Sequence, residues 1–173
     1  MKTFQKLQEG VYDPNIFKAF FLAGGPGSGK SFVVRKTTGG LGLRIVNSDV
    51  TFEKLIKDAD IDLDFRNMSP EREKERDVIR AKAKAITQRQ QSNLIAGRLG
   101  LVIDGTGKEY DNLSSQATGL RNLGYETYMI FVNTSLDTAL DRNNKRRRKL
   151  PADIVKDSWN GVQKNIGKFQ NFF

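Results

Sequence analysis

The sequence predicts a single α/β domain with three layers, in which helices cover both faces of a central parallel sheet. Short apolar runs alternate with segments of helical spacing, an order typical of parallel strands joined by right-handed crossovers. The chain has 173 residues, of which 38% are hydrophobic, and this suits one domain with a full core. We therefore expect residues 18–173 to form the domain, preceded by a short arm at residues 1–17.

The strands are expected where short runs are rich in apolar and β-branched residues, at residues 19–23, 43–47, 100–104 and 125–132. The helices are expected at residues 31–37, 50–57, 69–96 and 112–123, in at least the first part of 135–149, and from residue 151 to 166. Gly39 and Gly40 should end the first helix, and a serine cap followed by Pro70 should begin the third. The apolar stripe of this third helix is predicted at Val78, Ala81, Ala85 and Ile86.

A glycine-rich stretch directly follows the first expected strand. Residues 24–31 read Gly-Gly-Pro-Gly-Ser-Gly-Lys-Ser and match the pattern G-x-x-x-x-G-K-[ST] without a mismatch. Such glycines let backbone N–H groups surround an anion, and the start of the next helix adds a partial positive charge. Lys30 can then reach the β- and γ-phosphates as a catalytic cation, and the Ser31 hydroxyl can bind Mg²⁺.

This motif predicts a nucleoside triphosphate site, with ATP and Mg²⁺ as cofactors, and the three-layer sandwich of P-loop NTPases. The alternative is a glycine-rich turn that ends in Gly-Lys-Ser by chance. The expected ATP-binding residues of the stretch are Gly25, Pro26, Gly27, Ser28, Gly29, Lys30, Ser31 and Phe32.

Two aspartates come directly after expected strands. Ligands bind beyond the carboxyl ends of parallel strands, so Asp49 and Asp104 should share a cleft with the glycine-rich stretch. The chain has no histidine, so a general base must be a carboxylate or, less often, a lysine or tyrosine. Asp49 can take a proton or anchor a substrate, or it can cap the following helix, and these roles are compatible. Asp104 can hold Mg²⁺ or be a turn residue, and Thr106 and Lys108 are candidate substrate contacts.

A basic run follows the fourth expected strand. Residues 142–149 read Arg-Asn-Asn-Lys-Arg-Arg-Arg-Lys, and Arg142 and Arg146 are four residues apart on one expected helical face. Arginines from a closing segment stabilise the charge on a transferring phosphoryl group. We therefore expect a basic lid at about residues 142–150, in which Arg142 and Arg146 bind ATP and assist catalysis. The alternatives are a solvated basic run and a nucleic-acid patch.

The composition excludes several classes of protein. Cysteine is absent, which excludes disulfides, thiolate metal sites and cysteine nucleophiles. No run is long and apolar enough to span a membrane, and the N-terminus lacks the apolar core of a secretory signal, so we expect a cytoplasmic protein without a membrane partner. The formal net charge of +9 weakly favours an acidic partner such as nucleic acid.

The ordered motifs resemble those of the small P-loop kinases that include phage 5′-hydroxyl polynucleotide kinase and the zeta toxins. The resemblance covers about residues 18–168 and is carried by residues 24–31, the step Asn47-Ser48-Asp49, and residues 102–106, 142–146 and 150–155. It implies that Asp49 is the general base and that Arg142 and Arg146 contact the ATP phosphates. At the position where the phage kinase has an arginine that helps hold the substrate's phosphate, this chain has Phe52. An exposed aromatic at that position would stack on a base of the substrate.

These observations leave three hypotheses for the function. The first is a kinase that transfers the γ-phosphoryl group of ATP to a hydroxyl, with a nucleic-acid 5′-hydroxyl end as the acceptor. The second is a zeta-like kinase of a nucleotide-sugar or another small molecule, for which an antitoxin-like inhibitor would be a partner. The third is a nucleic-acid-binding ATPase module, in which the basic run follows a phosphate backbone.

Overall fold

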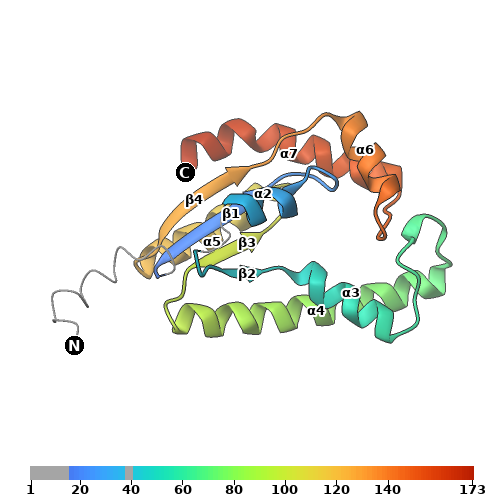
Figure 1. The fold of residues 1–173 in the computed structure, drawn as a ribbon, viewed down its shortest axis with the longest axis horizontal. Coiled ribbons are helices and arrows are strands. Elements are labelled where there is room, and N and C mark those ends of the chain that lie inside the picture. Colours follow the sequence, from blue (N-terminus) through green and yellow to red (C-terminus); the bar gives the residue numbers. More distant parts are fainter. Residues whose placement is uncertain (1–15, 38–40) are drawn as a thin grey trace.

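A computed structural model describes residues 16–37 and 41–173 (Figure 1). Most of the expected arm, residues 1–15, and the glycines expected to end the first helix lie outside the described residues. The strands are β1 (Lys18–Ala23), β2 (Arg44–Val46), β3 (Leu101–Asp104) and β4 (Glu126–Phe131). The helices are α2 (Lys30–Thr37), α3 (Ser48–Asp58), α4 (Pro70–Ala96), α5 (Tyr110–Asn122), α6 (Leu136–Lys145) and α7 (Ala152–Phe172), with a short 3₁₀ turn at Phe65–Asn67.

The strands form one sheet in the order β2-β3-β1-β4. Every pairing in it is parallel, as the alternation of apolar runs and helical segments predicts. Phe20 of β1 is in register with Val102 of β3 on one side and with Tyr128 of β4 on the other. Parallel strands bring their carboxyl ends to one edge of the sheet. The segments that follow β1, β2 and β3 are therefore neighbours in space.

Helices cover both faces of this sheet, which confirms the three-layer α/β fold (Figure 1). On one face, Phe21 of β1 belongs to the main core with Leu113 of α5 and Phe169 of α7. On the other face, Val34 of α2 packs against the fully buried Leu22 of β1. The alternation of side chains along β1 thus sends neighbouring residues to opposite cores.

The helices α3 and α4 form a second core at the β2 side of the sheet, where α4 runs along the lower edge of the view in Figure 1. Phe52, Ile56 and Phe65 are buried there with Ala83 of α4. The predicted apolar stripe of α4 is wrong: Val78 is 70% exposed and Ile86 is 44% exposed. The buried residues of α4 are instead Ala83 and Thr87. The partly buried Ile79 packs beside Ala83 against Phe52, Ile56 and Phe65, so this face of the helix is the one that meets α3.

No helix within the described ranges is both long enough and apolar enough to cross a membrane.

Candidate functional site

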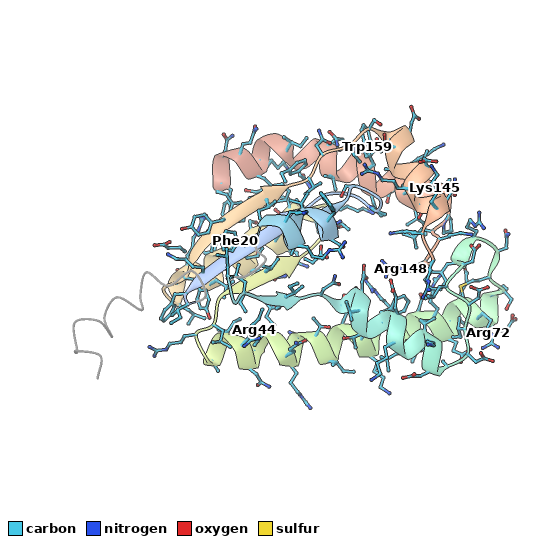
Figure 2. All side chains as sticks on the ribbon, in the orientation of Figure 1. Phe20, Arg44, Arg72, Lys145, Arg148 and Trp159 are labelled. Carbon is cyan, nitrogen blue, oxygen red and sulfur yellow. The ribbon has the colours of Figure 1, made fainter. Side chains whose placement is uncertain are left out.

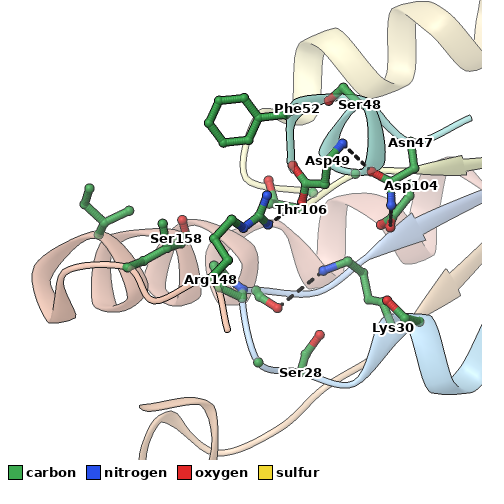
Figure 3. Close-up of a pocket in the computed structure, with 18 of the residues that line it drawn as sticks. Ser28, Lys30, Asn47, Ser48, Asp49, Phe52, Asp104, Thr106, Arg148 and Ser158 are labelled. Carbon is green, nitrogen blue, oxygen red and sulfur yellow. Dashed lines mark hydrogen bonds and ion pairs between the residues drawn. The ribbon is translucent and has the colours of Figure 1, made fainter. Parts of the chain in front are cut away.

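A cleft of about 1020 Å³ opens at the carboxyl edge of the sheet (Figure 3). Its walls come from the loop between β1 and α2, the segments after β2 and β3, one face of α4, and the residues around the end of α6. The expected site residues that line it are Gly25, Pro26, Gly27, Ser28, Gly29, Lys30, Ser31, Asp49, Phe52, Asp104, Thr106, Arg142 and Arg146. The predicted convergence of three strand ends on one cleft is therefore present.

The glycine-rich loop is packed tightly between the sheet and two helices. Gly27 has a φ of 80°, and a Cβ built on it would lie 2.5 Å from the carbonyl oxygen of Ala139 in α6. Only glycine combines this left-handed backbone with so close an approach. The loop is also tied to the β3 side, because the Gly24 N–H donates to the Thr106 carbonyl at 2.8 Å.

Arg142 holds this loop from the α6 side. Its NH1 group donates to the carbonyl oxygens of Gly27 and Ser28 at 3.3 and 3.2 Å. Arg142 therefore supports the backbone of the loop that would surround a triphosphate. The hydroxyl of Ser28 is buried and has no hydrogen-bond partner among the described residues, although Ser28 is one of the residues that line the cleft.

The Lys30 side chain folds back over the loop (Figure 3). Its Nζ donates to the carbonyl oxygens of Gly24 at 2.6 Å and Gly25 at 3.3 Å. Burial lowers the pKa of the Lys30 ammonium, although the negative charges of Asp104 and Asp49 act in the opposite direction. A partly buried cation with two carbonyl partners is well placed to exchange them for phosphate oxygens, which satisfy its charge better.

Asp49 lies at the start of α3 but does not cap it. The cap is Asn47, whose side-chain oxygen accepts from the Asp49 N–H at 2.7 Å. The Asp49 carboxylate instead lies between two arginines from distant parts of the chain. It accepts from NH1 of Arg80 in α4 and from NH2 of Arg148 after α6, each at 2.6 Å.

These arginines set the charge state of Asp49. Burial acts to raise the pKa of its carboxyl group, but the hydrogen bonds and charges of Arg148 and Arg80 outweigh burial and hold the pKa well below its usual range. Asp49 is consequently ionised at any pH at which the protein would work. Its carboxylate can orient a hydroxyl group by accepting a hydrogen bond from it. Because the pKa of this carboxyl is low, it is a weak base for removing the hydroxyl proton.

Asp104 lies beside this group at the end of β3. It accepts from the side-chain amide of Asn47 at 2.8 Å, so Asn47 joins the segments after β2 and β3 (Figure 3). Burial raises the pKa of the Asp104 carboxyl, and the nearby Lys30 charge partly offsets this effect. The described residues contain no group of three or more His, Cys, Asp or Glu side chains that could hold a metal by themselves.

Magnesium nevertheless fits the donors that line the cleft. It prefers oxygen ligands and usually binds through one or two protein groups, several waters and the phosphates of the substrate. The carboxylate of Asp104 and the hydroxyl of Ser31 both line the cleft, and both are donors of this kind. Their use as magnesium ligands stays a prediction.

The basic segment, which we define as residues 142–150, departs from the sequence prediction. The helix α6 ends at Lys145, and Arg146 has extended backbone angles. Arg142 and Arg146 therefore do not share a helical face, because the chain leaves the helix to reach α7. Arg146 and Arg148 both turn inward, and the Nε atom of each is buried without a hydrogen-bond partner among the described residues.

The inward direction of Arg148 is clear in Figure 2, where Arg72 and Lys145 extend away from the fold. The side chain of Arg148 is 13% exposed, whereas that of Lys145 is 74% exposed. The segment is also fastened by its backbone: the Lys149 N–H donates to the Leu63 carbonyl, and the Phe65 N–H donates to the Lys149 carbonyl, both at 3.0 Å. Four residues of the basic segment, Arg142, Arg146, Arg148 and Leu150, thus line the cleft.

The structure corrects one predicted contact and places the side chains of two other candidate residues outside the cleft. Phe52 is 3% exposed and packs against Phe65, so the expectation of an exposed aromatic that stacks on a base is wrong. Lys108 is not among the residues that line the cleft, because its side chain pairs with Asp157 of α7. Phe32 is 60% exposed, and its side chain also lies outside the cleft lining.

Sequence reasoning missed the functions of Asn47, Arg80 and Arg148 in arranging the site. The available signal for Arg80 was its place in the series Arg76, Arg80 and Lys84, which are four residues apart and therefore share one face of α4. All three line the cleft.

Comparison with known proteins gives one family and several structural relatives. A family model described as an AAA domain (AAA_33) matches residues 20–168. The Pnkp1/Rnl/Hen1 RNA repair complex contains a chain with a TM-score of 0.65 and 18% identity, covering 90% of this chain and 47% of that one. In the complex of AvrRxo1-ORF1 with AvrRxo1-ORF2 the TM-score is 0.71 and the identity 15%, with coverage of 96% and 57%.

A third relative is the PezAT chromosomal toxin–antitoxin system of Streptococcus pneumoniae, with a TM-score of 0.61, 17% identity, and coverage of 99% of this chain and 74% of that one. The chain spans about half the length of the first two relatives, 47% and 57%. No curated protein matches the sequence. At such identities these likenesses show the fold, which is α/β with a four-stranded parallel sheet.

Proposed function

Because the chain belongs to the AAA domain family AAA_33 and has a P-loop kinase-like fold, we propose that it is a kinase. In this proposal it transfers the γ-phosphoryl group of ATP to a hydroxyl group, and Mg²⁺ accompanies the ATP. The acceptor that we propose is a nucleic-acid 5′-hydroxyl end.

The observation that carries the proposal is the position of Asp49. An ionised carboxylate held by Arg80 and Arg148 lies in the same cleft as a complete phosphate loop. A hydroxyl that donates its hydrogen to Asp49 would present its oxygen toward the phosphates cradled by that loop. This is the arrangement that phosphoryl transfer to an alcohol requires.

The transfer forms a bond between the acceptor oxygen and the γ-phosphorus, and it breaks the bond between that phosphorus and the bridging oxygen. ADP leaves with the bridging oxygen, and the acceptor proton passes to Asp49 or to water. In a loose transition state the acceptor hydroxyl becomes acidic only after most of the bond to the leaving group has broken. A carboxylate of low pKa is then a sufficient base for the acceptor proton. Mg²⁺, when bound, would neutralise charge on the phosphates, with Asp104 and Ser31 as its protein donors.

The cations of the cleft would stabilise the phosphates as charge moves to the bridging oxygen. Lys30 would release the carbonyl oxygens of Gly24 and Gly25 and bind phosphate oxygens. The buried Nε of Arg146 has no hydrogen-bond partner among the described residues, which suits a residue whose ligand is an incoming anion. Arg142 would keep the loop in shape through Gly27 and Ser28.

The nucleic-acid acceptor is supported by the net charge of +9 and by the likeness to a chain of an RNA repair complex. A nucleotide-sugar or another small molecule is the second candidate, and a specific observation favours it. Phe52 is buried, so the cleft does not offer this ring as a stacking surface for a base. The likeness to the PezAT system belongs with this candidate, and an antitoxin-like inhibitor would then be a partner.

A nucleic-acid-binding ATPase module is the third candidate, and the basic segment argues against it. A groove that follows a phosphate backbone needs cations that are free to contact the phosphates. Arg148 instead pairs with Asp49 at 2.6 Å and approaches Glu53 at 3.5 Å. Its charge is directed at the acceptor side of the cleft.

The test is a transfer assay with ATP labelled at the γ-phosphate and Mg²⁺. We expect label on an oligonucleotide with a 5′-hydroxyl end and none on the same oligonucleotide already phosphorylated at that end. The KM for the oligonucleotide should rise with added KCl, with a logarithmic slope of about −0.7 in affinity per neutralised phosphate, while the KM for ATP changes less. A length series should improve from mononucleotide to short oligomer and then level off.

Flat dependence on salt and length, with good turnover of a nucleotide-sugar, would move the acceptor to the small-molecule class. Label that appears only in inorganic phosphate, whatever acceptor is offered, would contradict the kinase proposal and favour the ATPase.

A further inference from the structure

Asn143 of α6 is the most deeply buried polar side chain among the described residues, with an exposure of 1%. Its NH₂ group donates to the Leu150 carbonyl at 2.8 Å, and its side-chain oxygen accepts from the Leu150 N–H at 3.1 Å. One amide thus satisfies both backbone polar groups of Leu150, as a neighbouring strand would in a sheet. The turn formed by residues 144–149 is therefore closed by a side chain that lies inside the fold.

The same amide also holds Arg146. The side-chain oxygen of Asn143 accepts from NH2 of Arg146 at 2.9 Å, and within the described ranges this is the hydrogen bond that the Arg146 guanidinium donates. Two N–H donors therefore face the oxygen, and one carbonyl faces the NH₂ group, so only one orientation of the amide satisfies all three. Asn143 consequently sets the direction of a guanidinium whose residue lines the cleft.

The charges around Arg146 do not explain its inward position. Burial lowers the pKa of the Arg146 guanidinium, and the neighbouring charge of Arg148 lowers it further. Asp49 and Glu53 act in the opposite direction, but they pair with Arg148, at 2.6 and 3.5 Å. A guanidinium next to a like charge would turn toward water unless another group held it. Asn143 is a neutral acceptor, so it holds this guanidinium without cancelling its positive charge.

We propose that Asn143 is a positioning residue that directs Arg146 toward the ATP phosphates before ATP binds. This inference rests on the proposed kinase function, in which Arg146 stabilises charge on those phosphates. The hydrogen bonds of Asn143 join protein groups only, so the basic segment does not need ATP in order to close. A cation that is already in place costs no reorganisation when charge moves to the bridging oxygen.

The test is a double-mutant cycle that follows label transfer from ATP in Asn143→Ala, Arg146→Ala and the double variant. The matched control is Asn144→Ala, because Asn144 is the neighbouring asparagine, is exposed and does not line the cleft. Asn143→Ala should lower kcat by about 10- to 100-fold with little change in the KM for ATP, since a misplacement of about 1 Å can cost about 10²-fold. In the Arg146→Ala background it should change kcat by no more than about twofold. Asn144→Ala should match the wild type.

Limited digestion of the full chain with trypsin measures the closure without using activity. Arg147 is exposed, so the bond after it can be cut once the segment opens. The wild type and Asn144→Ala should resist cleavage within residues 145–149 whether or not ATP is present. Asn143→Ala should be cut there at least about 10-fold faster, because losing the two hydrogen bonds to Leu150 favours local opening. Mass spectrometry of the fragments locates the cleavage.

A second variant of similar size, Asn143→Asp, avoids the cavity that alanine leaves in the core. The carboxylate would pair with Arg146 and cancel its charge, and it could not donate to the Leu150 carbonyl. We therefore expect kcat to fall in this variant as well. Circular dichroism shows whether each variant keeps the wild-type fold.

The two proposals can fail separately. Protection of the wild-type segment that Asn143→Ala removes, without label transfer by the wild type, would keep the positioning of Arg146 and contradict the kinase function. An equal loss of kcat from Asn143→Ala in the wild-type and Arg146→Ala backgrounds would keep the kinase function and overturn the positioning, because Asn143 would then serve only the fold. Wild-type kcat in Asn143→Ala or Asn143→Asp, or rapid cleavage of the wild-type segment without ATP, would also overturn it.

Discussion

Replacing Asp49 with asparagine tests the centre of the proposed site. The carboxylate accepts from Arg80 and Arg148 at 2.6 Å, and an amide of the same shape keeps one acceptor oxygen and turns an N–H₂ group toward the other arginine. A hydrogen bond to a charged group contributes about 1.5–3 kcal/mol. The Asp49 side chain is 36% exposed, so solvent screening reduces this figure. We expect the free energy of unfolding to fall by about 2 kcal/mol, or about 4–8 °C in Tm for a chain of this size.

The same substitution should reduce label transfer by about 10²- to 10⁴-fold, the usual contribution of a positioned acid–base group. The KM for ATP should change little, because Asp49 lies on the acceptor side of the cleft. Thermal unfolding followed by circular dichroism and the transfer assay measure the two effects. The control is Asp58→Asn, an exposed position at the other end of α3. Wild-type transfer by a variant with lowered Tm would refute the reasoning, because Asp49 would then serve only the fold.

The pH dependence of the free energy of unfolding is a second test of the Asp49→Asn variant, because the direction of the expected change can be worked out. Burial raises the pKa of Asp49, but Arg148 and Arg80 outweigh burial and lower it overall. A group with a lowered pKa stabilises the fold above its unfolded pKa of about 3.9 and loses that contribution as the pH falls toward the folded value. The difference in stability between wild type and Asp49→Asn should be constant above about pH 5 and shrink below about pH 4. A constant difference down to about pH 2 would contradict the pairing.

Further substitutions test other parts of the cleft. Lys30→Ala should abolish transfer and weaken ATP binding in calorimetry, because the loop loses its own cation, and wild-type turnover would exclude that function. Arg146→Ala should lower kcat more than it raises the KM for ATP, since its contact matters as charge develops. A raised KM with unchanged kcat would make Arg146 a ground-state anchor instead. Gly27→Ala should lower the free energy of unfolding by about 1–3 kcal/mol, because its Cβ would lie 2.5 Å from the Ala139 carbonyl at a φ of 80°. As a control, Gly119→Ala, with open space around it in α5, should stabilise the protein by up to about 1 kcal/mol.

Most of the fold could be predicted because its signals are local. The apolar run of β1, the glycine pattern after it, and the cap and Pro70 of α4 each depend on a few neighbouring residues. The meeting of Asp49 and Asp104 at one edge followed from the parallel sheet alone. These signals do not depend on how distant helices pack.

The rest of the site depends on tertiary packing. Arg80 reaches Asp49 because the face of α4 is set by Ile79 and Ala83, and a sequence with other apolar candidates at 78 and 86 gives no preference for that face. Phe52 is buried because Phe65, from a segment without regular periodicity, packs against it. Arg148 lies inside the cleft because the chain leaves the helix after Lys145, and a continuous run of basic residues does not mark where a helix ends.

The backbone pairing of Lys149 with Leu63 and Phe65 makes the basic segment and the loop after α3 a single unit. In the proposed reaction, this unit contributes Arg146 to the ATP phosphates and Arg148 to the carboxylate that orients the acceptor. Because this unit would contact both substrates, a movement that changes its contacts with one substrate also changes its contacts with the other. Thermodynamic linkage then requires reciprocity. If bound ATP changes the affinity for the acceptor by some factor, the bound acceptor changes the affinity for ATP by the same factor. In the proposed reaction, the effect of ATP on acceptor affinity and the effect of the acceptor on ATP affinity would therefore be equal in size and sign.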